Sequence, residues 1–450
     1  MEKKKQIDCF LPYSTAAITQ SLAAQLHESG VVKNIYTLAA DVLPTEALPQ
    51  YTHQLQTGSL LSLATMRLIA TTATADYALF YLKQGPITLG YHALERMLQV
   101  AEETAAAMVY ADHYSVEAGK TVKHPVTDYQ LGSIRDDFDF GSVVLLKTEY
   151  LKEYAAKEVV KDYQFAGWYD LRLFLSREGE LFHLNEYLYT EEEDDLRASG
   201  EKQFDYVNPR NREVQIEMEQ AATAHLSAIK ALVDTTQYVQ PDFSGEAFPV
   251  EASVVIPVFN REKTVRDAVV SALSQKTDFP FNVIVVDNHS TDGTTKILSS
   301  LAADERLVHL IPTRTDLGIG GCWNYAINDV HCGRFAVQLD SDDLYSSENT
   351  LQTIVNAFHE QKAAMIVGSY RMCDFDLNTL PPGLISHNEW TEDNGCNNAL
   401  RINGLGAPRA FFTPLVRQHQ FPNTSYGEDY AMGLAFSRRF RIGRIYDELY

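Results

Sequence analysis

The pattern of apolar and polar positions predicts an α/β fold in the second half of the chain. Residues 253–259 (SVVIPVF) and 282–287 (NVIVVD) are continuous apolar runs rich in Val and Ile, which is typical of parallel strands buried on both faces. Between them, residues 264–275 carry an apolar stripe at helical spacing. Strand, helix and strand make the βαβ unit of a parallel sheet, whose ligands bind at the carboxyl ends of the strands.

The same plan occurs twice along the chain. Each copy opens with a short apolar run that has proline at the same place, Pro12 in the first copy and Pro257 in the second. Each continues with a strand, a turn, an amphipathic helix and a further strand. The corresponding stretches are 7–14 and 252–259, 76–114 and 334–372, and the segments that end at Tyr189 and Tyr450. The sequence therefore predicts two tandem α/β domains of similar length.

The region between the copies predicts a linker. Residues 190–203 (TEEEDDLRASGEKQ) form an acidic run, which we expect to be a solvated turn. Residues 211–233 place apolar side chains at mixed helical spacing and predict a connecting helix. We therefore expect domains over 1–195 and 249–450, joined by a helical linker over 196–248.

Polar side chains gather where three predicted strands of the second copy end. Three carboxylates in close sequence repel one another and raise one another's pKa unless a cation lies between them. Carboxylate oxygens are preferred ligands of Mg²⁺ and Mn²⁺, so the third strand end predicts a divalent metal site, with a solvated acidic turn as the alternative. For Asp287 and Asp292, the alternative role is capping of the following helix. The three groups are Asn260, Arg261 and Glu262; Asp287, Asn288 and Asp292; and Asp340, Asp342 and Asp343.

Composition narrows the class of protein and its partners. The chain has 450 residues, 45% hydrophobic and 22% charged, with a net charge of -22, so binding to nucleic acid or to anionic lipid is disfavoured. Five cysteines without a CxxC pair indicate neither a disulfide framework nor a zinc site. No run of about 18 apolar residues occurs. We expect a cytoplasmic protein without a transmembrane segment, and peripheral association with the inner face of the membrane stays open.

Four motifs in the second half of the chain resemble those of a known protein family. VVIPVFNRE, VVDNHSTDGT, LDSDDLY and GEDYAMG occur in this order between residues 254 and 433 and resemble the motifs of inverting family 2 glycosyltransferases of the GT-A fold. The resemblance implies two GT-A-like, Rossmann-like domains in tandem with mostly parallel sheets, of which 249–450 is catalytic. It also implies a UDP-linked nucleoside diphosphate sugar, a saccharide acceptor and a divalent metal, Mn²⁺ or Mg²⁺, used in cell-surface polysaccharide synthesis.

The resemblance also implies roles for single residues. Asp429 is the general base, Glu428 orients the acceptor, and Asp340 and Asp342 hold the metal. Trp390 and Asn403, in the stretch 387–412, are acceptor-binding by position only. The implied donor-binding residues are Pro257, Phe259, Asn260, Glu262, Asp287, Asn288, Gly318, Asn324, Asp340, Asp342 and Asp343.

Residues 315–327 (TDLGIGGCWNYAI) depart from the family pattern. Gly318, Gly320 and Gly321 still suit a close approach of the backbone to a ligand. We expect Trp323 to pack in the core rather than to stack on the donor.

The first copy lacks the acids of the second. Leu82, Lys83 and Gln84 stand opposite the acidic cluster, and Gly167 and Trp168 stand opposite Glu428 and Asp429. We expect the first copy to be non-catalytic and either to support the second or to bind glycan. The first copy does have acidic residues, but they lie in strands and loops that come later in the chain than Gln84. These residues are Asp112, Asp136, Asp137 and Asp139.

Two other functions stay open at this point. A sugar-1-phosphate nucleotidyltransferase also has a nucleotide-binding α/β sheet and acidic metal sites, but it needs a basic, glycine-rich loop that PVFNREKTV lacks. A catalytically inactive glycan-binding or scaffold protein would not need the four motifs.

Overall fold

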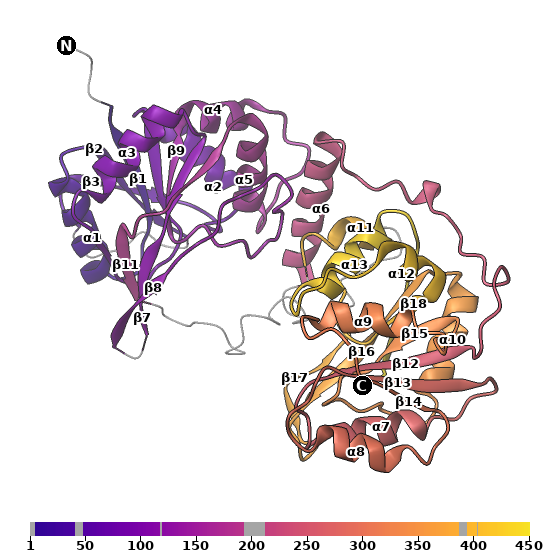
Figure 1. Cartoon of the computed structure of the whole chain (residues 1–450). Coiled ribbons are helices and arrows are strands. Elements are labelled where there is room, and N and C mark those ends of the chain that lie inside the picture. The colour runs from indigo at the N-terminus through magenta and orange to yellow at the C-terminus, as the bar shows by residue number, and fades with distance from the viewer. Residues whose placement is uncertain (1–4, 41–47, 118, 193–211, 387–393, 403) are drawn as a thin grey trace. The chain divides into compact units, whose positions relative to one another are not determined.

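The computed structural model describes residues 5–40, 48–117, 119–192, 212–386, 394–402 and 404–450 (Figure 1). The described residues fall into two compact units, the first made of 5–192 and 212–232 and the second of 233–450. Each unit has its own sheets and its own core. No helix in the described ranges is both long enough and apolar enough to span a membrane.

The first unit contains a seven-stranded sheet and a smaller four-stranded sheet. The large sheet has the order β10-β6-β9-β4-β1-β2-β3 and the small one the order β5-β11-β7-β8. The elements are β1 (Ile7–Pro12), α1 (Ala16–Glu28), β2 (Val32–Ala39), β3 (Thr52–Gln56), α2 (Leu63–Thr72), β4 (Tyr77–Tyr81), β5 (Ile87–Leu89), α3 (Ala93–Thr104), β6 (Met108–Ala111), β7 (His113–Glu117), β8 (Lys120–His124), β9 (Val143–Lys147), α4 (Thr148–Ala156), α5 (Gly167–Glu178), β10 (Leu181–Leu184), β11 (Tyr189–Glu192) and α6 (Arg212–Ala228).

The second unit is built around one sheet of eight strands. Its order is β14-β13-β12-β15-β18-β16-β17, and β19 also pairs with β16. The elements are η3 (Thr235–Gln237), β12 (Ala252–Val258), α7 (Val265–Leu273), β13 (Phe281–Asp287), α8 (Thr294–Leu301), β14 (Leu307–Leu310), α9 (Ile319–Ile327), β15 (Phe335–Gln338), α10 (Thr350–Gln361), β16 (Met365–Cys373), β17 (Thr379–Ile385), α11 (Gly395–Asn398), β18 (Arg409–Phe412), α12 (Thr413–His419), α13 (Glu428–Ser437) and β19 (Ile442–Glu448).

The two large sheets repeat one topology. The order β3-β2-β1-β4-β9-β6-β10 in the first unit corresponds to β14-β13-β12-β15-β18-β16-β19 in the second. In both, only β9 or β18 runs antiparallel to its neighbours, and the other pairs along this path are parallel. The predicted α/β class, with two mostly parallel sheets in tandem, is confirmed.

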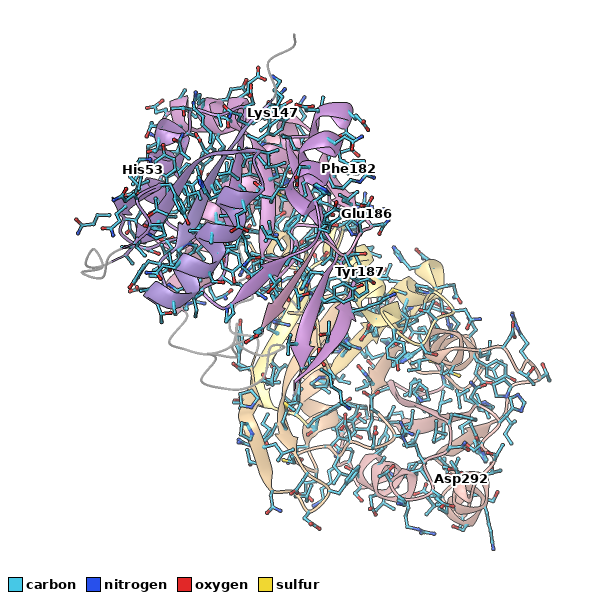
Figure 2. All side chains as sticks on the ribbon, turned by 90° about the vertical axis from the view of Figure 1, so that its left-hand side faces the viewer. His53, Lys147, Phe182, Glu186, Tyr187 and Asp292 are labelled. Carbon is cyan, nitrogen blue, oxygen red and sulfur yellow. The ribbon has the colours of Figure 1, made fainter. Side chains whose placement is uncertain are left out.

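Burial on both faces explains the continuous apolar runs of the central strands. Val254 and Ile256 of β12 lie in one core, together with residues of α7 and α10. Val255 points to the opposite face and lies in a second core, with residues of α9 and α13. Figure 2 shows the side chains as sticks on the strands and helices of both units. An alternating pattern is therefore absent, because neither face of β12 meets water.

The structure differs from two expectations about the region between the two copies. The predicted connecting helix forms α6, but it packs on α5 and belongs to the first unit, so the second unit begins at residue 233. The acidic run is not a solvated turn throughout, because residues 190–192 belong to β11 and Glu191 is only 2% exposed. The rest of that run lies outside the described residues.

Candidate active-site cleft

A cleft of about 790 Å³ opens at the carboxyl ends of the central strands of the second unit. The ends of β12 and β15, the loop after β13 and the N-termini of α9 and α13 all contribute to its lining. Its lining residues are Pro257, Val258, Phe259, Arg261, Asn288, His289, Thr315, Leu317, Gly318, Ile319, Cys322, Trp323, Gln338, Asp340, Ser341, Asp342, Arg409, Ser425, Tyr426, Gly427, Glu428 and Asp429. This is the sheet edge at which an α/β fold binds its ligands.

The acidic residues after β15 lie close enough to raise one another's pKa, although two arginines are near them. Burial raises the pKa of Asp340, and the nearby Asp342 and Asp429 raise it further, although Gln338 and Arg409 act in the opposite direction. Burial together with Asp340 and Asp342 raises the pKa of Asp343 to about 7. Asp342 Oδ2 lies 3.5 Å from Arg261 Nε, and both side chains are partly exposed. A cation bound in the cleft would relieve this repulsion.

The acids fit a metal that is bound together with a diphosphate. Across the ranges that the structure describes, no group of three or more His, Cys, Asp or Glu side chains could hold a metal ion on its own. Mg²⁺ at a phosphate site, however, takes only one or two carboxylates from the protein and the remaining oxygens from the phosphates and water. Asp340 and Asp342 both line the cleft and supply such oxygens.

The first turn of α13 brings two more carboxylates into the lining of the cleft. Asp429 Oδ2 lies 2.5 Å from Arg409 Nη2, and its Oδ1 accepts a hydrogen bond from the backbone N–H of Tyr430 at 2.6 Å. Glu428 is buried and its Oε2 has no hydrogen-bond partner within the described part of the chain. Burial raises the pKa of Glu428, and the neighbouring Asp429 adds to this rise. An unpartnered carboxylate oxygen in the cleft wall is free to meet a ligand.

Arg409 and Gln338 link the two acidic walls, and sequence reasoning missed both. Gln338 Nε2 donates to Asp340 Oδ1 at 3.0 Å, and Arg409 Nη1 donates to Gln338 Oε1 at 3.1 Å. Arg409 also pairs with Asp429, so a continuous polar chain runs from the end of β15 to α13. A polar Gln inside the apolar run FAVQL was the available sequence signal, because a buried polar side chain needs a partner.

The glycines of α9 serve packing rather than ligand approach. A Cβ at Gly320 would lie 2.0 Å from the Pro422 carbonyl oxygen, and one at Gly318 would lie 2.5 Å from the Thr424 carbonyl carbon. Gly320 N donates to the Thr424 carbonyl at 3.0 Å. These contacts hold the start of α9 against segment 422–424, which leads into α13. The expectation of backbone approach to a ligand is therefore wrong for Gly320, whereas Gly318 does line the cleft.

Five of the predicted donor residues do not line the cleft. Asn324 is one of them, and its side-chain amide bonds both the N–H and the carbonyl of Phe421 at 2.8 Å, so it fastens α9 to that segment. Asp343 is another, although the neighbouring Asp340 and Asp342 do line the cleft. The five are Asn260, Glu262, Asp287, Asn324 and Asp343.

Asp287 is fully buried at the end of β13. Its Oδ1 accepts from Ser290 N at 3.0 Å and its Oδ2 accepts from the Thr295 hydroxyl at 2.5 Å. Burial opposes ionisation, but these hydrogen bonds outweigh it and lower the pKa of Asp287. This carboxylate shapes the loop after β13 instead of facing the cleft.

Asn260 and Glu262 join the loop after β12 to the loop after β13. Asn260 Oδ1 accepts from Thr291 N at 2.7 Å, and Glu262 Oε2 accepts from Gly293 N at 2.9 Å. Both side chains are occupied by these hydrogen bonds and do not line the cleft. They therefore position the two loops, whereas a direct contact with the donor was predicted.

The structure brings the remaining described candidates together in the cleft wall, and these are Pro257, Phe259, Asn288, Gly318, Asp340, Asp342, Glu428 and Asp429. Trp390 and Asn403 lie outside the described residues. Trp323 is 4% exposed and contacts the rings of Phe411 and Phe421, which confirms its predicted packing role even though it also borders the cleft. Sequence reasoning gave no role to the exposed Tyr426 at the rim.

Comparison with known proteins gives a family-model match that lies within the second unit. Residues 253–414 match the family model described as glycosyl transferase family 2. An uncharacterised glycosyltransferase of Haemophilus influenzae is 27% identical over 128 residues, covering 28% of this chain and 50% of the relative. The putative teichuronic acid biosynthesis glycosyltransferase TuaG of Bacillus subtilis is 26% identical over 188 residues, covering 42% and 72%. The O-antigen chain rhamnosyltransferase WbaN of Salmonella anatum is 24% identical over 140 residues, covering 31% and 43%.

Solved structures show only partial likeness. TarS of S. aureus in complex with UDP aligns with a TM-score of 0.37 and 23% identity, covering 44% of this chain and 59% of that one. The mannosyltransferase PcManGT of Pyrobaculum calidifontis, in complex with GDP-Man and Mn²⁺, aligns with a TM-score of 0.34 and 20% identity, covering 53% and 64%. The chain spans half of the H. influenzae relative and less than half of WbaN. Residues 253–414, within the second unit, are therefore similar to glycosyl transferase family 2.

Proposed function

We propose that the second unit transfers a sugar from a nucleoside diphosphate sugar, UDP-linked, to a saccharide acceptor with inversion of configuration. The observation that carries this proposal is that Asp340, Asp342 and Asp429 line the same cleft. The family match over 253–414 supports the reaction class. The names of TuaG and WbaN support a role in cell-surface polysaccharide synthesis.

Asp340 and Asp342 would hold Mn²⁺ or Mg²⁺ beside the donor diphosphate. A divalent ion bound there supplies Lewis-acid stabilisation of the charge that develops on the leaving diphosphate. On the neighbouring wall, Asn288 Nδ2 is fixed by the Leu317 carbonyl at 2.8 Å, whereas its Oδ1 has no hydrogen-bond partner within the described part of the chain. That oxygen is placed to accept a hydrogen bond from the nucleoside, with Pro257 and Phe259 beside it.

Asp429 is the proposed general base. Its carboxylate takes the proton of the acceptor hydroxyl as that hydroxyl attacks the sugar, which gives inversion in a single displacement. The ion pair with Arg409 fixes the orientation of this carboxylate. Glu428, whose Oε2 is unpartnered, orients the acceptor. The first unit has Lys83 and Trp168 at the corresponding places, so we propose that it is non-catalytic.

Calorimetry with UDP tests the donor site. Wild-type protein is expected to bind UDP more tightly with Mn²⁺ than without it, and Asp342→Ala should lose the metal-dependent part because it removes a ligand oxygen. Asp447→Ala, which changes an exposed aspartate of the same unit away from the cleft, is the matched control and should bind as wild type does. Unchanged Mn²⁺-dependent binding in Asp342→Ala would refute the site, and tighter binding of GDP than of UDP would refute the UDP-linked donor.

A further inference from the structure

The first unit keeps a pocket at the place that corresponds to the cleft of the second. The pocket has a volume of about 300 Å³, at the lower end of small-molecule sites. Lys83 lines it directly after β4, the strand that corresponds to β15 in the repeated topology. Trp168 lines it in the first turn of α5, opposite to Asp429 in the sequence alignment of the two copies. A concave site is thus present in this unit although the acids of the second copy are absent.

The floor of this pocket is polar and almost closed to solvent. His113, Ser115 and Glu191 line it, and their exposed fractions are only 1%, 2% and 2%. Burial acts against ionisation of Glu191, but its contacts with His113, Lys83 and Ser142 outweigh it and lower its pKa to about 2. The ammonium of Lys83 balances the charge of this carboxylate. The floor therefore has hydrogen-bonding groups without a surplus of either charge.

His113 has an unused nitrogen. Its ring is stacked between those of His124 and Tyr189, with centroid distances of 4.4 and 5.0 Å. Its Nε2 lies 3.2 Å from Glu191 Oε1 but not in hydrogen-bond geometry, and its Nδ1 also has no hydrogen-bond partner among the residues that the structure describes. A buried polar atom without a partner costs free energy, and a ligand hydroxyl that bonds it would recover this cost.

The rim adds acceptors, donors and an aromatic wall. Asp139 Oδ2 lies 2.8 Å from His124 Nε2 and keeps about half of its side chain exposed, and Asp137 pairs with Arg135 at 2.8 Å. Trp168 forms part of the same wall. Because Lys83 is paired with Glu191 and Arg135 with Asp137, the lining of the pocket offers no free lysine or arginine for a phosphate and suits a neutral ligand. A ring with hydroxyl groups that both donate and accept, and with an apolar face for the indole, fits this set of groups.

We propose that this pocket of the first unit binds a neutral saccharide residue without turning it over. The ring lies against Trp168, and its hydroxyls bond to Lys83, Asp139 and the free nitrogen of His113. The proposal does not depend on the activity of the second unit, because every lining residue of the pocket belongs to the first.

Calorimetry on the full chain tests this proposal. The probes are glucose, galactose, N-acetylglucosamine, N-acetylgalactosamine and rhamnose, with inorganic phosphate and UDP as anionic probes. At least one sugar is expected to bind with one site per chain, and to change tryptophan fluorescence in wild type but not in Trp168→Phe. Lys83→Met and Asp139→Asn, which alter partly exposed rim side chains, should each weaken binding at least tenfold. Thermal unfolding and circular dichroism verify that these variants are folded.

Two matched controls locate the binding. Lys120→Met changes an exposed lysine of the same unit outside the pocket and should leave sugar affinity unchanged. Asp342→Ala should also leave it unchanged, since that residue lies in the other unit, so failure of the donor site and failure of this site are distinguishable. The proposal is overturned if no sugar of the panel binds, if folded Lys83→Met and Asp139→Asn keep wild-type affinity, if Asp342→Ala abolishes sugar binding, or if inorganic phosphate displaces the sugar.

Discussion

Arg409 is the residue on which the geometry of the cleft depends most directly. It is largely buried and holds Asp429 and Gln338 at the same time, while Gln338 holds Asp340. A buried arginine with two fixed partners positions both carboxylates, because its planar guanidinium offers donors in a rigid arrangement. In the proposed reaction it is a positioning residue, since its contacts are with protein groups.

Asp429→Asn separates binding from chemistry. The amide cannot accept a proton from the acceptor, so transfer is expected to fall by about 10²–10⁴-fold. UDP binding with Mn²⁺ should stay within a few fold of wild type, because Asp340 and Asp342 are intact. A radiolabelled sugar-transfer assay beside calorimetry measures both quantities. Arg409→Met should also reduce transfer more than it reduces UDP binding, but to a smaller extent than Asp429→Asn does. Transfer by Asp429→Asn at more than a tenth of the wild-type rate would show that Asp429 is not the base.

At the scale of elements, the position of α13 depends on α9. Segment 422–424 packs on the first turn of α9 so closely that only glycine fits at 318 and 320, and Asn324 bonds the backbone of Phe421. Segment 422–424 then leads directly to Gly427 and Glu428. The acidic wall of α13 is therefore fixed by packing contacts that are remote from the chemistry.

Gly320→Ala tests this dependence. The added methyl would overlap the Pro422 carbonyl oxygen, so the two segments must move apart at a cost of about 1–3 kcal/mol. We expect a lower Tm by calorimetry and a reduced transfer rate, since Asp429 moves with segment 422–424. Gly58→Ala is the control, because a Cβ at Gly58 meets nothing within 4 Å. An unchanged Tm in Gly320→Ala would contradict the packing argument.

The docking of α6 on the first unit is expected to depend on pH. His225 of α6 is 1% exposed and accepts a hydrogen bond from Arg177 Nη1 at 2.8 Å. Burial, with the Arg177 charge adding to it, lowers the pKa of His225 to about 4. The unfolded state, with a pKa of about 6.5, binds a proton first as the pH falls. The stabilisation is therefore complete above about pH 6.5 and is lost as the pH falls toward 4.

Hydrogen exchange over residues 212–228 measures this effect. Between pH 7.5 and pH 5, the free energy of protection of these amides is expected to fall. This fall should exceed that of the α9 amides by on the order of 1–2 kcal/mol. His225→Gln, which does not titrate, should lose this extra pH dependence. An equal pH dependence in wild type and His225→Gln would contradict the assignment to His225.

At the scale of the whole molecule, one topology is used twice with different chemistry. The strand orders agree along the whole path from β3 to β10 and from β14 to β19. The residues after corresponding strands nevertheless differ in charge, since Asp340 follows β15 whereas Lys83 follows β4. The hydrophobic cores of the two units share no residue. Each unit can therefore carry its own site on its own core.

A fragment of residues 233–450 is expected to fold and to bind UDP with Mn²⁺ as the full chain does. Every lining residue of the cleft belongs to it, and its sheet is covered on both faces by its own helices. Sugar binding by the first-unit pocket should be absent from this fragment. Circular dichroism and calorimetry measure these outcomes, and a folded fragment without UDP binding would show that the first unit contributes to the donor site.

Much of the fold could be predicted from the sequence because its signals are local. The apolar runs of β12 and β13 and the stripe of α7 each lie within about ten residues. The helix of residues 212–228 was also predicted, but it was assigned to the linker. It belongs to the first unit because it packs on α5, and this contact could not be predicted since α5 is distant in sequence. Burial of Glu191 was missed for the same reason, since an acidic run indicates solvent unless a sheet partner is known.

The sequence by itself determined the α/β class, the internal repeat and the ordered motifs that carry Asp340, Asp342, Glu428 and Asp429. Periodicity and motif order are properties of neighbouring residues, so they can be recognised without a structure. Only the tertiary structure decided that Arg409 joins the two acidic walls and that Asp287, Asn260 and Glu262 fasten loops. It alone placed Lys83, His113, Trp168 and Glu191 around a second pocket. The physical reason is that these contacts join strands and helices that are tens of residues apart, and folding alone brings them within hydrogen-bonding distance.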